Sequence, residues 1–228
     1  MAPTTKYVVP PSTLDFEEKY RFLTPKQFNE YYQPLLSLLK KHNLDGLDID
    51  IEEKVSISVP LRLINALYQD LGPSFILTMA PLAATLADKD GYNLSGFSYF
   101  ALDTLTSIPF TTPSPSSPST STSNLISFYN AQFYGGFARS PSFYKSIIDA
   151  GWDPARIVMG VLDSENDGST NGFVDLQTLG ETVRGLRGMY GEFGGVAGWE
   201  YWDAGVSDGG IEAWEWVKRV GEALFGPF

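Results

Sequence analysis

Four acidic residues recur at short intervals in the segment DGLDIDIE, residues 45–52. Because side chains alternate across a β-strand, Asp48, Asp50 and Glu52 would lie on one face of a strand and the aliphatic residues on the other. Carboxylates this close resist ionising together, so we expect one of them to hold its proton near neutral pH. A protonated carboxyl group beside an ionised one is suited to general-acid catalysis. Glu52 is nearest the carboxyl end of the strand, where β/α barrels place their active sites, and is the predicted proton donor.

Two other interpretations of these acids stay open. Asp and Glu also bind Mg²⁺ or Ca²⁺, and the acids could serve only the packing of the strand. The chain has no cysteine and a single histidine, His42, which excludes disulfides, zinc–thiolate sites, cysteine nucleophiles and multi-histidine metal sites. We expect acid catalysis with no metal and no cofactor, whereas a metal-dependent reaction would stop in excess chelator.

The composition narrows the class of protein further. The chain has 228 residues, a net charge of −11, 43% hydrophobic residues and 14% aromatic residues. An acidic chain is a poor ligand for nucleic acid, which selects clustered Lys and Arg. We expect no membrane partner, because no apolar run approaches the roughly 18 residues that cross a bilayer. The first residues, MAPTTK, lack an apolar signal core, which predicts a cytosolic location, or a secreted one if the N-terminus is truncated.

Short β-type runs alternate with amphipathic helical stretches along the chain. The predicted strands are residues 44–51, 75–82, 126–134, 157–162 and 195–202. The predicted helices that follow them are residues 61–71, 97–105, 141–150, 176–190 and 211–225. Such alternation predicts right-handed βαβ crossovers and a parallel sheet. The fold class is therefore α/β, either a β/α barrel or an open doubly wound sheet.

Two segments fall outside this alternation. Ahead of the acidic strand, Thr24, Pro25 and Gln27 form a capping-box pattern that predicts a helix as far as Lys41, with a kink at Pro34. A short strand is predicted at residues 6–9. The Ser/Thr/Pro-rich stretch TTPSPSSPSTSTSN, residues 111–124, cannot bury apolar surface and predicts a mobile loop.

The acidic segment resembles the signature of glycoside hydrolase family 18, the chitinases and endo-β-N-acetylglucosaminidases, in which Asp-x-x-Asp-x-Asp-x-Glu ends the fourth barrel strand. Three further blocks are similar to the fifth, sixth and eighth strands of that family: LTMAP (77–81), FYNAQFY (128–134) and GGVAGWEY (194–201). With NLSGF (93–97) between them, the wording is most similar to the fungal endo-β-N-acetylglucosaminidases. The resemblance runs from about residue 28 to the C-terminus.

The resemblance implies a role for each matched residue. Glu52 would protonate the glycosidic oxygen, while the 2-acetamido carbonyl of the substrate acts as the nucleophile, an exception to the usual two-carboxylate scheme. Asp50 would orient the acetamido N–H group, and Asp48 would tune the charge of Asp50. Tyr134 and Gln132 would hydrogen-bond the acetamido group and hold its oxygen near the anomeric carbon.

Three more residues are candidates for substrate binding. Trp199 would form the apolar floor under the sugar. Asn130 shares a strand face with Gln132, and Met79 would line the pocket. For Tyr134, Trp199 and Met79 the alternative is packing in the protein core.

The implied reaction is retaining hydrolysis of the β-1,4 bond between N-acetylglucosamine residues. The fungal-type wording favours the chitobiose core of N-glycans, so the expected partner is an oligosaccharide that contains N-acetylglucosamine. An endochitinase and a catalytically inactive, lectin-like barrel are the alternatives.

The sequence departs from the family in its N-terminal part. A complete barrel has eight βα units in about 250 residues, but only 44 residues precede Asp45. We count about five βα units and one preceding helix, and expect residues 1–228 to be one incomplete, N-terminally truncated (β/α)8 catalytic domain. An unpaired edge beside the catalytic strand predicts aggregation, dimerisation or weak activity.

Overall fold

The structure is a computed structural model, and it describes residues 24–88, 93–112, 119–168 and 171–226. The predicted strand at residues 6–9 lies outside these ranges. No helix within them is long and apolar enough to cross a membrane. The chain divides into two compact units, one within residues 1–77 and 94–126 and the other within residues 78–93 and 127–228.

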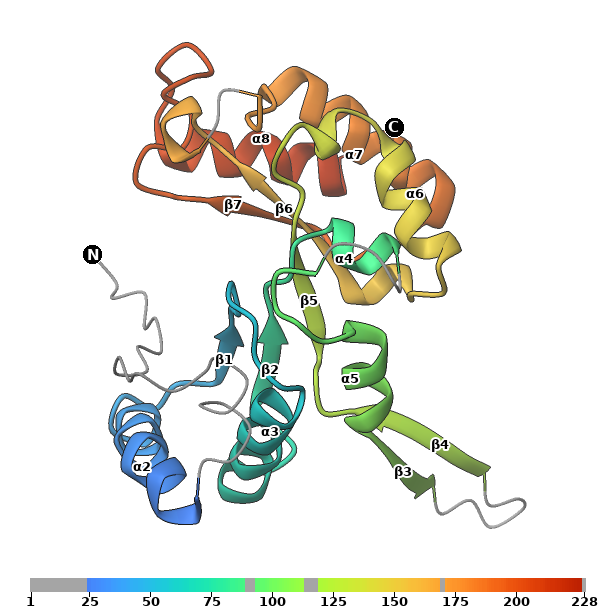
Figure 1. Cartoon of the computed structure of the whole chain (residues 1–228). Helices are drawn as coiled ribbons and strands as arrows, with labels where there is room; N and C mark the ends of the chain where they lie inside the picture. Colours follow the sequence, from blue (N-terminus) through green and yellow to red (C-terminus); the bar gives the residue numbers. More distant parts are fainter. Residues whose placement is uncertain (1–23, 89–92, 113–118, 169–170, 227–228) are drawn as a thin grey trace. The chain divides into compact units, whose positions relative to one another are not determined.

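The elements follow one another in the predicted α/β order (Figure 1). The strands are β1 (Gly46–Ile49), β2 (Ile76–Met79), β3 (Ser107–Thr112), β4 (Ser119–Asn124), β5 (Phe128–Gln132), β6 (Ile157–Leu162) and β7 (Val196–Trp199). The α-helices are α2 (Pro25–Lys41), α3 (Ser58–Leu71), α4 (Ala84–Ala87), α5 (Tyr99–Leu105), α6 (Pro141–Asp149), α7 (Leu176–Tyr190) and α8 (Ala213–Phe225). Three 3₁₀ turns are η1 (Phe137–Arg139), η2 (Pro154–Arg156) and η3 (Glu165–Asp167).

In the first unit, α2 begins as its sequence predicts. The Thr24 hydroxyl accepts a hydrogen bond from the Gln27 amide at 3.2 Å, and the Gln27 side chain accepts one from the Thr24 amide at 2.9 Å. This reciprocal pair satisfies two amides that a helix start leaves unpaired. The helix continues through Pro34, and its buried residues are Tyr32, Leu36 and Leu39.

Strand β1 is held against the start of β2 by a close backbone approach. The Ile76 amide donates to the Asp45 carbonyl at 2.9 Å. A Cβ atom at Gly46 would lie only 2.4 Å from the Ile76 carbonyl oxygen, so this position has room for glycine alone. The strand ends at Ile49, earlier than the predicted residue 51, and Asp50 and Glu52 follow it.

The prediction of a mobile loop for the Ser/Thr/Pro-rich stretch is wrong for most of its residues. Residues 111–112 and 119–124 belong to the antiparallel pair β3–β4, with Ser107 opposite Asn124 and Thr112 opposite Ser119. Thr is a strand-favouring residue, and antiparallel pairing satisfies the backbone without burying much apolar surface. Low-complexity composition therefore did not exclude a hairpin. Residues 113–118 lie outside the described ranges.

The second unit contains a parallel sheet whose registers the structure fixes. Thr78 pairs with Phe128, Tyr129 with Ile157 and Met159 with Val196. In this unit β5 pairs with both β2 and β6, and β6 pairs with β7, so these strands stand in their order along the chain. All six residues of β6 are buried.

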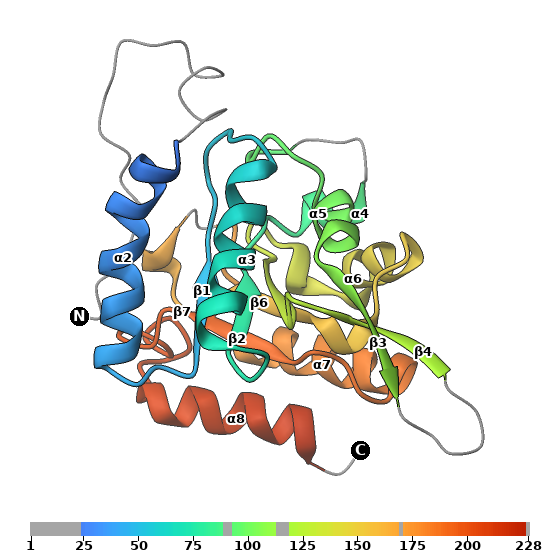
Figure 2. The ribbon, with the colours of Figure 1, turned by 90° about the horizontal axis from the view of Figure 1, so that it is seen from below.

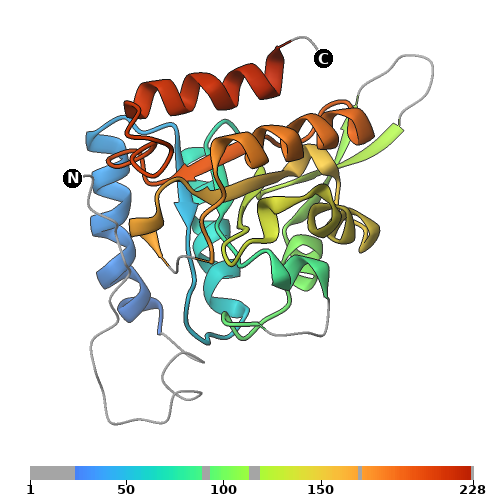
Figure 3. The ribbon, with the colours of Figure 1, turned by 90° about the horizontal axis from the view of Figure 1, so that it is seen from above.

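Helices α7 and α8 of the second unit lie side by side, as Figures 2 and 3 show. The buried residues of α8, Trp216, Val220 and Ala223, recur at helical spacing. Near the C-terminal ends of both helices, the Arg187 guanidinium donates to the carbonyls of Ala223 and Gly226, both at 3.0 Å.

Candidate active site

The three predicted catalytic acids lie together in the first unit. Asp48 is on β1, and Asp50 and Glu52 follow in the segment directly after it. All three side chains are exposed, whereas Ile49 between them is 8% exposed. This alternation is the one expected when acids share a face, although the acids stand in solvent rather than against a buried layer.

The segment after β1 is anchored by Ser95, which is 3% exposed. The Ser95 hydroxyl donates to the carbonyl of Ile51, the residue between Asp50 and Glu52, at 2.8 Å. The Ser95 carbonyl accepts from the Val55 amide at 2.9 Å. These two bonds fix the backbone on both sides of Glu52.

Ser95 is held in turn by Tyr99, the first residue of α5. The two hydroxyl groups are 2.9 Å apart, and Tyr99 is 1% exposed. Burial raises the pKa of the Tyr99 phenol, and the negative charge of Asp50 raises it further. The Tyr99 hydroxyl therefore stays neutral near physiological pH. Ser95 and Tyr99 were not predicted as site residues, although Ser95 falls in the NLSGF block.

Gly96 lets the two segments approach closely. Its φ is +80°, a conformation that favours glycine, and a Cβ atom there would lie 3.1 Å from the Lys54 Cβ and 3.2 Å from the Lys54 Cα. The backbone around Gly96 thus packs directly on the segment that carries the acids.

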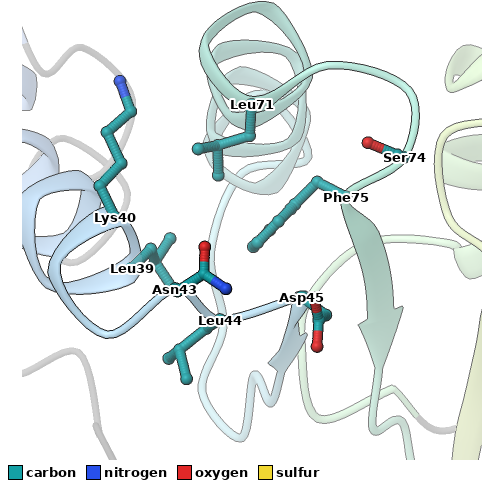
Figure 4. Close-up of a pocket in the computed structure, with 8 residues that line it drawn as sticks. All are labelled: Leu39, Lys40, Asn43, Leu44, Asp45, Leu71, Ser74 and Phe75. Carbon is teal, nitrogen blue, oxygen red and sulfur yellow. The ribbon is translucent and has the colours of Figure 1, made fainter.

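A pocket of about 260 Å³ lies at the opposite, amino-terminal end of β1 (Figure 4). It is lined by Leu39, Lys40, Asn43, Leu44, Asp45, Leu71, Ser74 and Phe75. Barrel active sites form at the carboxyl ends of strands, so this pocket is on the wrong side of the strands for catalysis. Asp45 belongs to this end, and its carbonyl makes the first hydrogen bond to β2.

In the second unit, β5 presents the predicted polar face. Asn130, Gln132 and Tyr134 are half-buried, and they alternate with the buried residues Tyr129, Ala131 and Phe133. Tyr134 lies two residues beyond the end of the strand.

Gln132 is locked to the chain that follows β2. Its side-chain amide donates to the Ala80 carbonyl at 2.9 Å. Its backbone amide donates to the Pro81 carbonyl at 2.8 Å, and its backbone carbonyl accepts from the Ala83 amide at 3.0 Å. A polar amide midway along an apolar strand needs such partners, and its orientation is fixed before any ligand arrives.

Met79 is placed differently from the other candidates. It is 1% exposed, and it is in register with Tyr129. In a parallel ladder, residues in register point to the same face, so Met79 belongs with the buried row of β5 and not with Asn130 and Gln132. The structure favours the packing interpretation for this residue.

Trp199 is the last residue of β7 and is 45% exposed. Its carbonyl accepts a hydrogen bond from the Asp163 amide at 3.1 Å, which fixes its backbone to the end of β6. The neighbouring aromatic residues are more exposed than Trp199: Tyr201 is 62% exposed and Trp202 is 90% exposed. Trp199 is therefore accessible to a sugar ring.

A second acidic cluster, which the sequence analysis did not predict, lies in the same unit. Asp163, Asp167 and Asp203 each offer an oxygen atom within 4.8 Å of the others. Burial raises the pKa of Asp163 to about 7, and the charges of Asp167 and Asp203 add to this effect. The signal available in the sequence was an aspartate directly after the wholly apolar run IVMGVL.

The five parallel strands and their following helices are those of a partial β/α barrel, and solved structures share this fold. A fungal endo-beta-N-acetylglucosaminidase from glycosyl hydrolase family 18 is 32% identical, with a TM-score of 0.76, and the match covers 96% of this chain and 71% of that one. The chitinase ChiC from Aspergillus fumigatus is 37% identical, with a TM-score of 0.69, covering 90% of this chain and 68% of that one.

The chain belongs to glycoside hydrolase family 18, which confirms the predicted resemblance and the predicted fold class. A family 18 chitinase from Pseudoalteromonas aurantia, 21% identical with a TM-score of 0.63, shares the fold over 94% of this chain and 73% of that one. No protein-family model matches the sequence, and a search of curated proteins finds no match.

Proposed function

We propose that this chain is a glycosidase that hydrolyses the β-1,4 bond between two N-acetylglucosamine residues, with the chitobiose core of N-glycans as its substrate. The observation that carries the proposal is the series Asp48, Asp50 and Glu52, which stands exposed at the carboxyl end of β1 in a member of family 18. Similarity to both an endo-beta-N-acetylglucosaminidase and a chitinase supports the class of linkage.

In the proposed reaction, Glu52 donates its proton to the glycosidic oxygen as the bond from that oxygen to the anomeric carbon breaks. The carbonyl oxygen of the substrate's own acetamido group attacks the anomeric carbon and closes a five-membered ring. Asp50 accepts the acetamido N–H and offsets the positive charge of the ring, while Asp48 tunes Asp50. Water then opens the ring and returns a proton to Glu52.

The other residues that the resemblance implies would bind the sugar. Tyr134 and Gln132 hydrogen-bond the acetamido group, and Asn130 extends the same polar face. The exposed indole of Trp199 stacks on the C–H face of the sugar. The fixed orientation of Gln132 supports this role, because a group that is already oriented loses little entropy on binding.

The central test is Glu52→Gln, with Glu53→Gln as its matched control, since Glu53 is the adjacent exposed acid. General-acid catalysis is worth about 10²–10⁴-fold in rate, so E52Q loses at least that much turnover on a high-mannose glycoprotein while E53Q keeps it. Equal activity of E52Q and the parent chain would refute the assignment. A parent chain that binds the sugar without cleaving it would instead support the lectin-like alternative.

Substrate choice and the nucleophile need separate assays. Release of glycan from a high-mannose glycoprotein, compared with cleavage of chitin oligomers, distinguishes an endo-β-N-acetylglucosaminidase from an endochitinase. A substrate with a hydroxyl in place of the 2-acetamido group tests the nucleophile, because without the carbonyl no ring can form. Cleavage of that analogue at the normal rate contradicts substrate assistance.

A further inference from the structure

The acidic cluster of Asp163, Asp167 and Asp203 connects the carboxyl ends of two neighbouring strands in the second unit. Asp163 directly follows β6, Asp167 ends the 3₁₀ turn η3, and Asp203 lies in the turns that follow β7. One oxygen of each side chain lies within 4.8 Å of an oxygen of both others. The three carboxylates therefore converge on one point.

Burial and hydrogen bonding provide a second observation. Asp163 is 1% exposed, and its Oδ1 atom is buried without a hydrogen-bond partner. The Oδ1 atom of Asp203 is in the same state. A buried carboxylate oxygen that lacks a donor carries a large desolvation cost, so two such atoms in one cluster indicate that a positive partner belongs there.

Protein groups do not supply that partner in the described ranges. No salt bridge recorded there involves any of the three carboxylates. The charged groups that act on Asp163 are Asp167 and Asp203, both acidic. The amide of Glu200 donates to Asp167 Oδ2 at 3.2 Å, but it does not satisfy the buried oxygens Asp163 Oδ1 and Asp203 Oδ1.

We propose that Asp163, Asp167 and Asp203 bind a calcium ion that joins the segments following β6 and β7. Ca²⁺ binds oxygen at about 2.3–2.6 Å, and three oxygens that lie within 4.8 Å of one another can share one such ion. Mg²⁺ usually keeps several waters and is bound by one or two carboxylates, whereas Ca²⁺ takes more oxygen ligands, so three converging carboxylates favour Ca²⁺. Asp167 and Asp203 are half-buried, and water completes the coordination from their side.

Gly198 on β7 is part of this arrangement. A Cβ atom there would lie 2.3 Å from the Asp163 Oδ2 atom, so only glycine leaves space for the carboxylate to turn towards the cluster. The bound ion fixes the turns that follow Trp199, and its role is structural. The inference is independent of the proposed reaction.

The test uses the full chain, freed of metal with chelator and then titrated with CaCl₂ at pH 7.5. Isothermal titration calorimetry measures binding, and thermal melting measures stabilisation. At about 100 times the dissociation constant, calcium raises the melting temperature by about 5–10 °C. Asp203→Asn and Asp167→Asn each lose the heat of binding and the shift.

The matched control is Glu165→Gln, because Glu165 is an exposed acid in η3 outside the cluster. E165Q keeps both calcium responses. A parent chain that gives neither heat nor a melting shift overturns the proposal, as does loss of binding in E165Q equal to that in D203N. A melting temperature that ignores calcium but rises as the pH falls from 8 to 6 also overturns it, because the carboxyl groups then share protons instead of a metal.

Discussion

Removal of the Ser95 hydroxyl tests whether the segment around Glu52 is held as the structure indicates. Ser95→Ala deletes the donor to the Ile51 carbonyl and the partner of the Tyr99 hydroxyl. Each buried hydrogen bond contributes about 1 kcal/mol, and a polar group left unpaired costs about 1–3 kcal/mol. We expect the free energy of unfolding to fall by about 2–4 kcal/mol, which in a chain of this size lowers the melting temperature by about 5–15 °C.

Tyr99→Phe provides the comparison. It removes the bond between the two hydroxyls but leaves Ser95 bonded to Ile51, so the expected loss is about 1 kcal/mol. The double variant costs less than the sum of the two single ones, because the shared bond is lost only once. Ser127→Ala, at an exposed serine, controls for the loss of a hydroxyl as such.

The assay is urea unfolding of the four variants, read together with turnover. We expect the turnover of S95A to fall further than that of Y99F, because only S95A frees the backbone between Asp50 and Glu52. The reasoning fails if S95A costs no more than S127A, or if Y99F destabilises the chain more than S95A does.

Three further predictions concern single positions. Trp199→Ala raises KM with little change in stability, because the indole is 45% exposed. Trp216→Ala, at a residue that is 4% exposed, lowers the free energy of unfolding by about 3–5 kcal/mol. Equal losses of stability in the two variants would contradict this prediction. Gly46→Ala destabilises the chain by about 1–3 kcal/mol, because the added Cβ meets the Ile76 carbonyl oxygen. Gly188→Ala in α7, where nothing lies within 4 Å of the added Cβ, stabilises the chain by up to about 1 kcal/mol. Thermal melts that rank the two variants the other way disprove the close approach of Gly46 to Ile76. Asp175 caps α7 by accepting from the Thr178 amide at 2.9 Å, and this bond lowers the pKa of Asp175 below 3.8. The stabilisation of the protein by the Asp175 carboxylate is thus present above about pH 4 and lost as the pH falls. We expect Asp175→Ala to cost about 1 kcal/mol in the free energy of unfolding at pH 7 and less at pH 3, measured by urea titration. An equal cost at both pH values is the contrary result.

Helices and fully buried strands were predictable to the residue where local chemistry marks both ends. The observed β6 and α7 have the predicted limits, because β6 is an unbroken apolar run and α7 begins at a capping aspartate. Strands β1 and β7 end earlier than predicted. The sequence after Ile49 and Trp199 still contains strand-favouring residues, but the observed strands end at those two residues.

The residues of the candidate site also fall into those that the sequence predicts and those that it does not. Asp48, Asp50 and Glu52 could be found because they are close in sequence and their spacing matches one strand face. Ser95 and Asp163 could not, because each acquires its meaning from a contact across tens of residues, Ser95 with Ile51 and Asp163 with Asp203. Periodicity reports what faces solvent or core, whereas such contacts depend on the register between elements.

The hydrogen bonds from Arg187 to the last turn of α8 have a practical consequence for protein production. The Arg187 guanidinium donates hydrogen bonds to the carbonyls of Ala223 and Gly226. The end of α8 is therefore bonded to α7 within the second unit. Removing the last turn of α8 would take away the carbonyl acceptors of Arg187, so a shortened version should keep the chain as far as Gly226.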